Sequence, residues 1–295
     1  MPNSWIRTNT LGISSPPITE VDSHRHTVTT NGLEYSYLEY GSPDNTPVIL
    51  LHGVWSTGAV WHDIAEALKD THHVRSVDFR GRSQSDWAPD GDYSTEAYVS
   101  DVLGLYEAWN LEKATVIGHS MGGGVATALA SEHPERVDSL VVIDAGPVMR
   151  AGSAVEFERQ LASLSQDFPS MAAARAWQRN ALPNISDDAV ERRLDARLVE
   201  RNGRVVWRED PRIRTARELT ARPSEDEMWK RFLSVKARTL FVLGGNSQLV
   251  TDEVEKRLTS EMADARSVRI ANAGHNVFED NHDDTIAAIR AFLRG

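Results

Sequence analysis

The chain has 295 residues, a formal net charge of −11 and no cysteine. The absence of cysteine excludes disulfides, zinc–thiolate sites and a cysteine nucleophile, and the acidic balance disfavours non-specific binding to nucleic acid. The first 22 residues are polar and lack the apolar run of a signal peptide, and no stretch is long and apolar enough to span a membrane. We therefore expect a cytoplasmic protein with no nucleic-acid partner and no membrane partner.

Short apolar runs alternate with helix-like segments along most of the chain. A hairpin is predicted first, around the turn signal Asn31-Gly32. Buried strands are then expected at Val48–Leu51, Val74–Phe79, Ala114–Gly118, Leu140–Ile143, Thr239–Leu243 and Ser267–Ile270. Helices are predicted over 57–69, 94–110, 121–133, 251–262 and 283–294. This alternation predicts an α/β fold with a mostly parallel sheet flanked by helices.

The alternation stops between residues 148 and 232. This segment contains helix-like stretches with many charges and no apolar run typical of a buried strand. We interpret it as a helical cap inserted into a core that comprises residues 23–147 and 233–295. Residues 1–22 are expected to form a tail outside the core.

The segment Gly118-His119-Ser120-Met121-Gly122 matches the pattern G-x-S-x-G between a predicted strand and a predicted helix. A serine on such a sharp turn has its hydroxyl lifted clear of the sheet, at a helix N-terminus that stabilises developing negative charge. Glycines are needed because side chains at those positions would clash with the adjoining strand and helix. The pattern therefore predicts Ser120 as a nucleophile.

These motifs resemble the α/β-hydrolase superfamily. Gly118–Gly123 has a sequence that is common at the family's nucleophile turn. His52-Gly53 follows the third strand, where the family carries its oxyanion-hole loop. The run from Asp78 to Ser85 resembles the family's D-x-R-G-x-G-x-S loop, although Ser83-Gln84 replaces the usual glycine spacing. Ala273-Gly274-His275 lies after the last strand, where the family has its histidine. The resemblance covers about residues 24–147 and 236–294, and implies a hydrolase.

A serine nucleophile needs an adjacent base. Among the ten histidines, His275 lies in the loop directly after the final core strand, so we predict it as the base. His119 is expected to point away from the nucleophile and to pack or hydrogen-bond beside the site.

The third member of the triad is less obvious. Most of the superfamily places an aspartate after strand seven, but this chain has Gly244–Thr251 there, without a carboxylate. Asp252 is the first acid beyond it and is interpreted as a helix cap. Asp144 ends a core strand, and some branches, among them haloalkane dehalogenases and acetamidomethylene-succinate hydrolase, place the acid at this point. The latter also resembles the chain in its G-x-x-S-x-L-V-[ST] run. We therefore favour Asp144, although many relatives carry a non-catalytic aspartate there.

The tetrahedral oxyanion of such a reaction needs two preorganised donors. We expect the backbone N–H groups of Met121, at the helix start, and of Val54, after His52-Gly53. Trp55 and His119 are the candidate substrate-binding residues, and Trp177, Trp207 and Trp229 could equally line a pocket or pack in the core.

No metal and no cofactor are expected. Gly122-Gly123-Gly124 lacks the Lys-Ser/Thr of a phosphate-binding loop, and no pair of histidines has a metal-binding spacing with carboxylate support. Residues 172–222 hold twelve arginines, no lysine and eight acidic residues. The ordinary interpretation is solvated helix faces with paired charges; the sharper one is that one or two arginines bind a carboxylate of the substrate.

The sequence thus predicts a serine hydrolase that cleaves a small carboxylic ester, lactone or activated amide through an acyl-serine intermediate. Two alternatives stay open, a C–C bond or enamide hydrolase with the same triad and a hydrolase-fold ligand receptor with little turnover. The partner is expected to be a small-molecule substrate, which the arginines would favour if it is anionic. Oligomeric state and substrate identity do not follow from the sequence.

Overall fold

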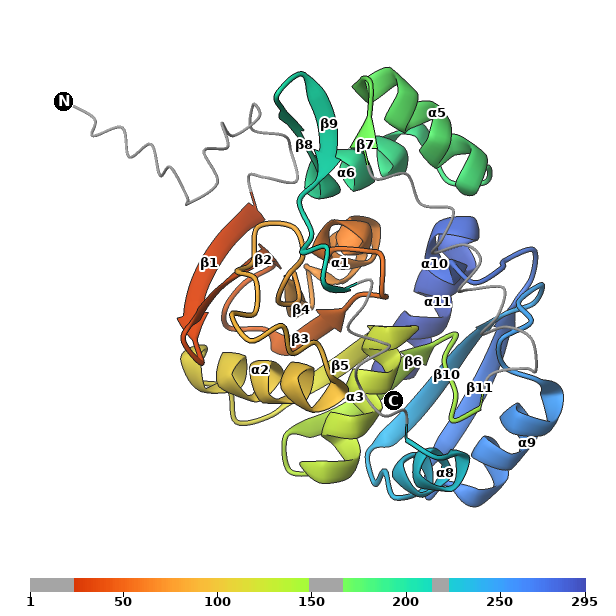
Figure 1. The fold of residues 1–295 in the computed structure, drawn as a ribbon. Coiled ribbons are helices and arrows are strands. Elements are labelled where there is room, and N and C mark those ends of the chain that lie inside the picture. Colours follow the sequence, from red (N-terminus) through yellow and green to blue (C-terminus); the bar gives the residue numbers. More distant parts are fainter. Residues whose placement is uncertain (1–23, 149–166, 214–222) are drawn as a thin grey trace.

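The computed structural model describes residues 24–148, 167–213 and 223–295 (Figure 1). The tail predicted over residues 1–22 lies outside the described residues. Within them, no helix is long and apolar enough to cross a membrane.

An eight-stranded sheet forms the centre of the molecule, in the order β1-β2-β4-β3-β5-β6-β10-β11. Its strands are β1 (Arg25–Thr30), β2 (Leu33–Tyr40), β3 (Thr46–Leu51), β4 (His72–Val77), β5 (Ala114–His119), β6 (Val137–Ile143), β10 (Arg238–Gly244) and β11 (Ala265–Ile270). Strand β2 pairs in antiparallel fashion with both β1 and β4, and the pairs from β4 to β11 are all parallel. The mostly parallel sheet and each strand predicted from the sequence are confirmed.

Helices cover both faces of this sheet (Figure 1). The core helices are α1 (His62–Leu68, preceded by the 3-10 turn η2, Gly58–Trp61), α2 (Thr95–Ala108), α3 (Met121–Glu132), α8 (Glu225–Leu233), α9 (Asp252–Glu261), α10 (Val277–Asp280) and α11 (His282–Leu293). Alternate residues of one strand serve opposite faces, as β3 illustrates. Ile49 and Leu51 lie in one apolar cluster with residues of α2, α3 and α8, and Leu50 lies in the other with residues of α1 and α11. Burial on both faces explains why central strands such as β3 and β6 contain continuous apolar runs.

The inserted segment contains strands as well as helices. Its described elements are β7 (Asp167–Phe168), α5 (Met171–Ala181), α6 (Asp187–Arg197), β8 (Leu198–Arg201) and β9 (Arg204–Trp207). The three strands form a separate antiparallel sheet in the order β7-β9-β8. The prediction of a purely helical cap is therefore wrong. The strands have two to four residues, and β8 and β9 include the charged residues Glu200, Arg201 and Arg204, so they lack an apolar run.

The cap elements form a small layer beside the main sheet (Figure 1). They pack around their own cluster, which includes Phe168, Val190, Leu194 and Val205. By contrast, α8 falls within the range expected for the cap but packs against α3 and α9, and its Phe232 lies in a cluster of the core. The part of residues 148–232 that includes α8 thus packs with the core.

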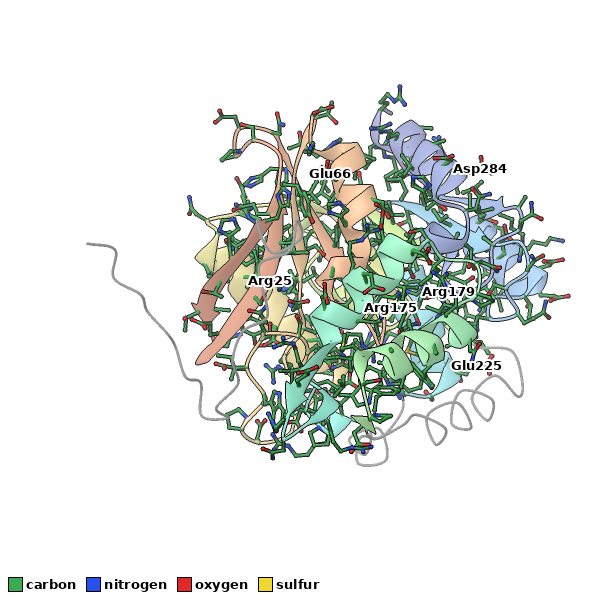
Figure 2. The ribbon with its side chains drawn as sticks, turned by 90° about the horizontal axis from the view of Figure 1, so that it is seen from above. Arg25, Glu66, Arg175, Arg179, Glu225 and Asp284 are labelled. Carbon is green, nitrogen blue, oxygen red and sulfur yellow. The ribbon has the colours of Figure 1, made fainter. Side chains whose placement is uncertain are left out.

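Arginine–carboxylate pairs hold much of the cap surface together. Figure 2 shows Arg175 and Arg179 on helix α5, and they pair with Glu191 and Asp187 of α6. Seven of the nine described arginines in 172–222 have such a partner: Arg175, Arg179, Arg192, Arg193, Arg197, Arg204 and Arg212. The ordinary interpretation of the arginine excess accounts for most of these residues.

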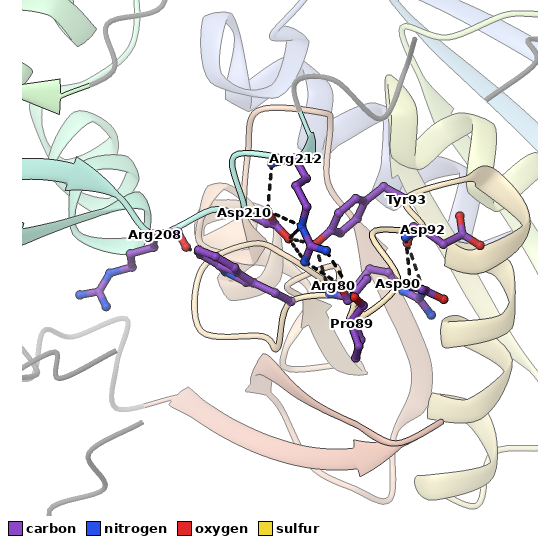
Figure 3. A network of polar contacts seen from close by, with 10 residues as sticks. Arg80, Pro89, Asp90, Asp92, Tyr93, Arg208, Asp210 and Arg212 are labelled. Atoms are coloured by element: carbon purple, nitrogen blue, oxygen red, sulfur yellow. Dashed lines mark hydrogen bonds and ion pairs between the residues drawn. The ribbon is translucent and has the colours of Figure 1, made fainter. Parts of the chain in front are cut away.

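A second polar network joins the end of the cap to a core loop (Figure 3). The carboxylate of Asp210 is fully buried, accepts hydrogen bonds from the Tyr93 hydroxyl at 2.5 Å and from Arg212 Nε at 2.9 Å, and is held at an acidic pKa below its usual value. Hydrogen bonds from the Arg212 side chain lower this pKa, whereas burial alone would raise it. The Trp87 indole N–H also donates to the carbonyl of Arg208 at 3.2 Å. These contacts fix the connection between the two regions.

Candidate active site

Ser120 lies at the turn between β5 and α3 with φ 53° and ψ −117°. This left-handed backbone is unusual for a non-glycine residue and marks a strained turn. Its N–H donates to the carbonyl of Ile143 at 2.9 Å, which ties the turn to the neighbouring strand β6. A Cβ at Gly118 would lie 2.2 Å from the Gly122 carbonyl oxygen, and one at Gly122 would lie 2.2 Å from that of Leu51. Both glycines are therefore required by close backbone approach.

His275 follows β11 and reaches the serine across the carboxyl edge of the sheet. Its Nε2 lies 3.1 Å from the Ser120 hydroxyl, and its Nδ1 lies 2.7 Å from a carboxylate oxygen of Asp144. An acceptor carboxylate requires the proton on Nδ1, which leaves Nε2 free to accept a proton from the serine. The three side chains predicted as a triad thus form one hydrogen-bonded chain.

Asp144 follows β6 with φ 46° and a side chain that is fully buried. Its N–H donates to the Val242 carbonyl of the adjacent strand β10 at 2.9 Å, so the sheet fixes its position. Asp252 lies elsewhere: its side chain is 90% exposed and pairs with Arg269 at 3.0 Å. The helix cap predicted for Asp252 is made instead by Thr251, whose side chain accepts from the N–H of Val254.

Ser247 is a site residue that sequence reasoning missed. It lies in the loop after β10, where most relatives were expected to carry the acid, and its hydroxyl donates to Asp144 Oδ2 at 2.6 Å. The backbone N–H of Gly244 approaches the other carboxylate oxygen at 3.3 Å. The serine in the G-x-x-S-x-L-V-[ST] run was the available signal, since a buried carboxylate after β6 needs donors from the neighbouring strand.

The loop after β3 carries the expected oxyanion donor Val54. Nδ1–H of the buried His52 donates to the Gly53 carbonyl at 2.7 Å, and His52 Nε2 accepts from the Phe79 N–H at 3.2 Å. Burial, followed by the charge of Arg82, lowers the pKa of His52 to about 3, so the ring is neutral. As first residue of α3, Met121 has an N–H without an intrahelical acceptor.

His119 is a support of the histidine loop. The ring is buried, and its Nε2–H donates to the backbone carbonyl of His275 at 2.9 Å. Burial, and then the charge of His275, hold the pKa of His119 well below its usual value. These contacts agree with the expectation that His119 packs beside the site. They give no support to its assignment as a substrate-binding residue.

The tryptophans separate into different environments. Trp55 follows Val54 on the oxyanion loop and is partly buried there. Trp177 and Trp207 pack with each other at a centroid distance of 5.6 Å inside the cap, and Trp229 of α8 is buried beneath Arg257. Trp229 is therefore a core residue, and Trp55 is the tryptophan that lies next to the expected oxyanion donor.

Across residues 24–148, 167–213 and 223–295, no group of three or more histidine or acidic side chains could hold a metal ion. What the described residues bring together is a serine, a histidine and an aspartate, linked by hydrogen bonds. This arrangement can perform nucleophilic acyl transfer.

The chain is similar to known proteins in sequence and in fold. Residues 46–282 match the model of the alpha/beta hydrolase fold. The chain is 28% identical over 269 residues to the sn-1-specific diacylglycerol lipase ABHD11 of Mus musculus, covering 88% of this chain and 85% of the lipase. It is 29% identical over 257 residues to the esterase YbfF of Escherichia coli, covering 85% and 94%. A crystal structure of E-2-(acetamidomethylene)succinate hydrolase superposes with a TM-score of 0.83 at 26% identity, covering 92% of this chain and 99% of that one.

Proposed function

Because the chain belongs to the alpha/beta hydrolase fold family, we propose that it is a serine hydrolase that cleaves a small carboxylic ester, lactone or activated amide. The hydrogen-bonded chain from Ser120 through His275 to Asp144 carries this proposal. The named relatives support it, since they include an esterase and a lipase. No cofactor is needed for this chemistry.

The reaction begins when the Ser120 oxygen attacks the carbonyl carbon of the substrate. Nε2 of His275 accepts the serine proton as the bond forms, and Asp144 stabilises the resulting imidazolium through Nδ1–H. The carbonyl oxygen becomes an oxyanion, which the N–H groups of Met121 and Val54 stabilise. Collapse of the tetrahedral intermediate expels the alcohol or amine, which takes the proton from His275, and leaves an acyl group on Ser120.

Water completes the cycle. His275 removes a proton from a water molecule, whose oxygen attacks the acyl carbon through a second tetrahedral intermediate. Collapse of that intermediate breaks the bond between the acyl carbon and the Ser120 oxygen and releases the carboxylic acid, while His275 returns its proton to Ser120. The neutral His275 must be regenerated in each half of the cycle, and the Asp144 contact to Nδ1 keeps Nε2 available for both transfers.

A C–C bond or enamide hydrolase is the second candidate. The position of Asp144 after β6 and the likeness to a solved acetamidomethylene-succinate hydrolase favour it. Such an enzyme uses the same nucleophile and base on a substrate whose leaving carbanion or enamine is stabilised. A ligand receptor with the same fold is the remaining alternative, and it differs from both enzymes by the absence of multiple turnovers.

An anionic substrate is a narrower proposal. Arg197 supports it, because this cap residue is almost fully buried, has an unpartnered Nε and reaches Glu209 only at 3.5 Å. The charges of Arg197 and Arg193 also lower the pKa of His52, beside the oxyanion loop. A guanidinium in this place suits a substrate carboxylate.

A cytoplasmic location stays a prediction.

Labelling with a fluorophosphonate probe tests the function directly. The probe phosphonylates an activated serine, so the wild type should be labelled and Ser120→Ala should not, and the variant should also lose turnover of ester, lactone and enamide substrates. Circular dichroism on both proteins controls for folding. Normal labelling and turnover of the alanine variant would refute the assignment, and a wild type that never turns over any of these substrates would favour the receptor.

A further inference from the structure

We propose that Arg82 is a positioning residue for the oxyanion hole, because its guanidinium holds the backbone carbonyl of Val54. The inference rests on the proposed hydrolase function and names a side chain that this reaction depends on. Arg82 lies in the loop after β4, far in sequence from both the nucleophile and the base.

The side chain of Arg82 joins three elements of the core. It is 1% exposed, its Nε donates to the Val54 carbonyl at 2.8 Å, and its Nη1 donates to the Tyr98 hydroxyl of α2 at 3.2 Å. The two bonds use different edges of a rigid, planar guanidinium. Tyr98 thus fixes the orientation with which Arg82 meets the oxyanion loop.

Peptide geometry explains why a carbonyl contact controls an N–H donor. In a trans peptide, the carbonyl and the following N–H point in opposite directions within one plane. The Gly53 carbonyl and the Val54 N–H share such a plane, which His52 fixes through its 2.7 Å bond to the Gly53 oxygen. Arg82 fixes the next plane through the Val54 oxygen. With both planes held, φ and ψ of Val54 are both set, and its N–H is aimed before the substrate arrives.

The charge of Arg82 makes this an unusual place for an arginine. Arg80, two residues earlier, is paired with the buried carboxylate of Asp101 at 2.6 Å. No carboxylate of the described residues lies within ion-pair distance of Arg82, whose partners are a carbonyl and a phenol. A buried guanidinium without a carboxylate is costly compared with an apolar side chain of similar volume. Its placement against the loop where negative charge develops accounts for that cost.

Arg82→Met tests the inference, because methionine keeps much of the length and removes the donors and the charge. The substrate is p-nitrophenyl butyrate, and an alkyl trifluoromethyl ketone, which adds to the serine as a tetrahedral oxyanion, serves as transition-state analogue. We expect kcat to fall by about 10- to 100-fold, less than the roughly 10²–10³-fold loss of a whole oxyanion donor. KM should stay within about twofold, and the inhibition constant of the ketone should rise by the same factor as kcat/KM falls.

Arg80→Lys is the matched control from the same loop. It weakens the pair with Asp101 and should lower the unfolding temperature, with kcat and ketone affinity unchanged at 25 °C. If Arg82→Met fails to fold, Arg82→Lys and Tyr98→Phe replace it, and each should show a smaller drop in kcat with a parallel loss of ketone affinity. Wild-type kcat and ketone affinity in a folded Arg82 variant would overturn the inference while Ser120→Ala stays inactive. Activity retained by Ser120→Ala would instead overturn the proposed function.

Discussion

Different interactions stabilise the core and the cap. Both faces of the main sheet are covered by apolar side chains that are almost completely buried, whereas the described part of the cap has one cluster of eight buried apolar residues. The cap adds arginine–carboxylate pairs across its surface, many of them exposed, and exposed pairs contribute little to stability. The core is therefore the more extensively packed region, and Ser120, Asp144 and His275 all lie on it.

This difference suggests a division of roles, with the reaction carried out by the core and substrate choice influenced by the cap. A triad works only if its side chains hold their geometry to within a fraction of an ångström, which strand ends of a buried sheet provide. The cap meets the core through apolar contacts, such as that of Ala196 with a core cluster, and through charges. Arg193 of α6 forms a buried pair with Glu279, only four residues after His275, and Arg192 pairs with Asp63 of α1 at 2.6 Å. Changes in the core should therefore alter rate, and changes in the cap should alter stability and substrate choice.

The largest expected effect is on the core. Asp144→Asn keeps the side-chain shape but allows the wrong tautomer of His275, so kcat should fall on the order of 10⁴-fold, as the corresponding change does in serine proteases. Asp252→Asn is the matched control: it loses one exposed pair with Arg269 and should leave kcat near the wild-type value. Steady-state kinetics on one ester would measure both. If kcat fell strongly in Asp252→Asn and stayed unchanged in Asp144→Asn, the catalytic acid would be assigned to the segment after β10 instead.

The next effect tests the boundary between the two regions. Arg193→Met leaves the Glu279 carboxylate buried without its partner, which should lower the free energy of unfolding by about 3–5 kcal/mol. Combining it with Glu279→Gln removes the orphaned charge, so the double variant should recover much of this loss. Urea unfolding of the wild type, both single variants and the double variant measures the coupling. Strict additivity would show that the pair does not couple cap and core.

Acid should destabilise the core through two buried histidines. The pKa values of His52 and His119 lie below the ordinary value near 6.5, so the unfolded chain binds more protons than the folded one as the pH falls. Stability is then fully present above about pH 6.5 and declines below it, by about 1.4 kcal/mol per pH unit for each such histidine. Urea unfolding of His119→Asn between pH 7 and 5 should show a shallower decline than the wild type. Equal declines would show that His119 does not contribute.

The same contrast explains what the sequence could predict. Strands such as β3 and β6 are buried on both faces, so their apolar runs are visible without any structure, and the residues at their ends follow. The G-x-S-x-G pattern after one such strand predicts Ser120, and the absence of an acid after β10, together with the family resemblance, favours Asp144 at the end of another. The distance from His275 to both of them depends on how the last loop folds, which spacing along the chain leaves open.

The strands of the cap were harder to predict because they are short and contain charged residues. β8 and β9 join at Asn202-Gly203, with φ values of 51° and 71°, the same turn as Asn31-Gly32 between β1 and β2. The first hairpin was predicted because its flanks alternate clearly between polar and apolar residues. The second has the same turn signal, but its strands hold only four residues each and carry arginines. Arg82 and Ser247 were missed for another reason, since their roles come from contacts between loops distant in sequence.

The smallest effect concerns the cap and the charge of the substrate. Arg197 pairs with Glu209 at 3.5 Å, as most described cap arginines pair with a carboxylate, but it is also buried and its Nε has no hydrogen-bond partner. A bond from a guanidinium to a substrate carboxylate contributes about 1.5 kcal/mol or more, so an ester that carries a carboxylate should have a kcat/KM about tenfold above that of its neutral analogue. Arg197→Met should abolish this preference and leave the neutral ester largely unaffected.

Arg175→Gln is the control for that experiment, because Arg175 is an exposed arginine of α5 that pairs with Glu191 on the cap surface. It should keep the preference for the carboxylate-bearing ester. Salt distinguishes two origins of such a preference. A buried contact at Arg197 is screened little by salt. Attraction by the cap surface as a whole is largely screened at 1 M ionic strength, where the Debye length is about 3 Å. Persistence of the preference at high salt in the wild type, with its loss in Arg197→Met alone, would assign it to that side chain. Equal kcat/KM values for the two esters at low salt would show that the cap arginines serve the structure of the cap and its contacts with the core.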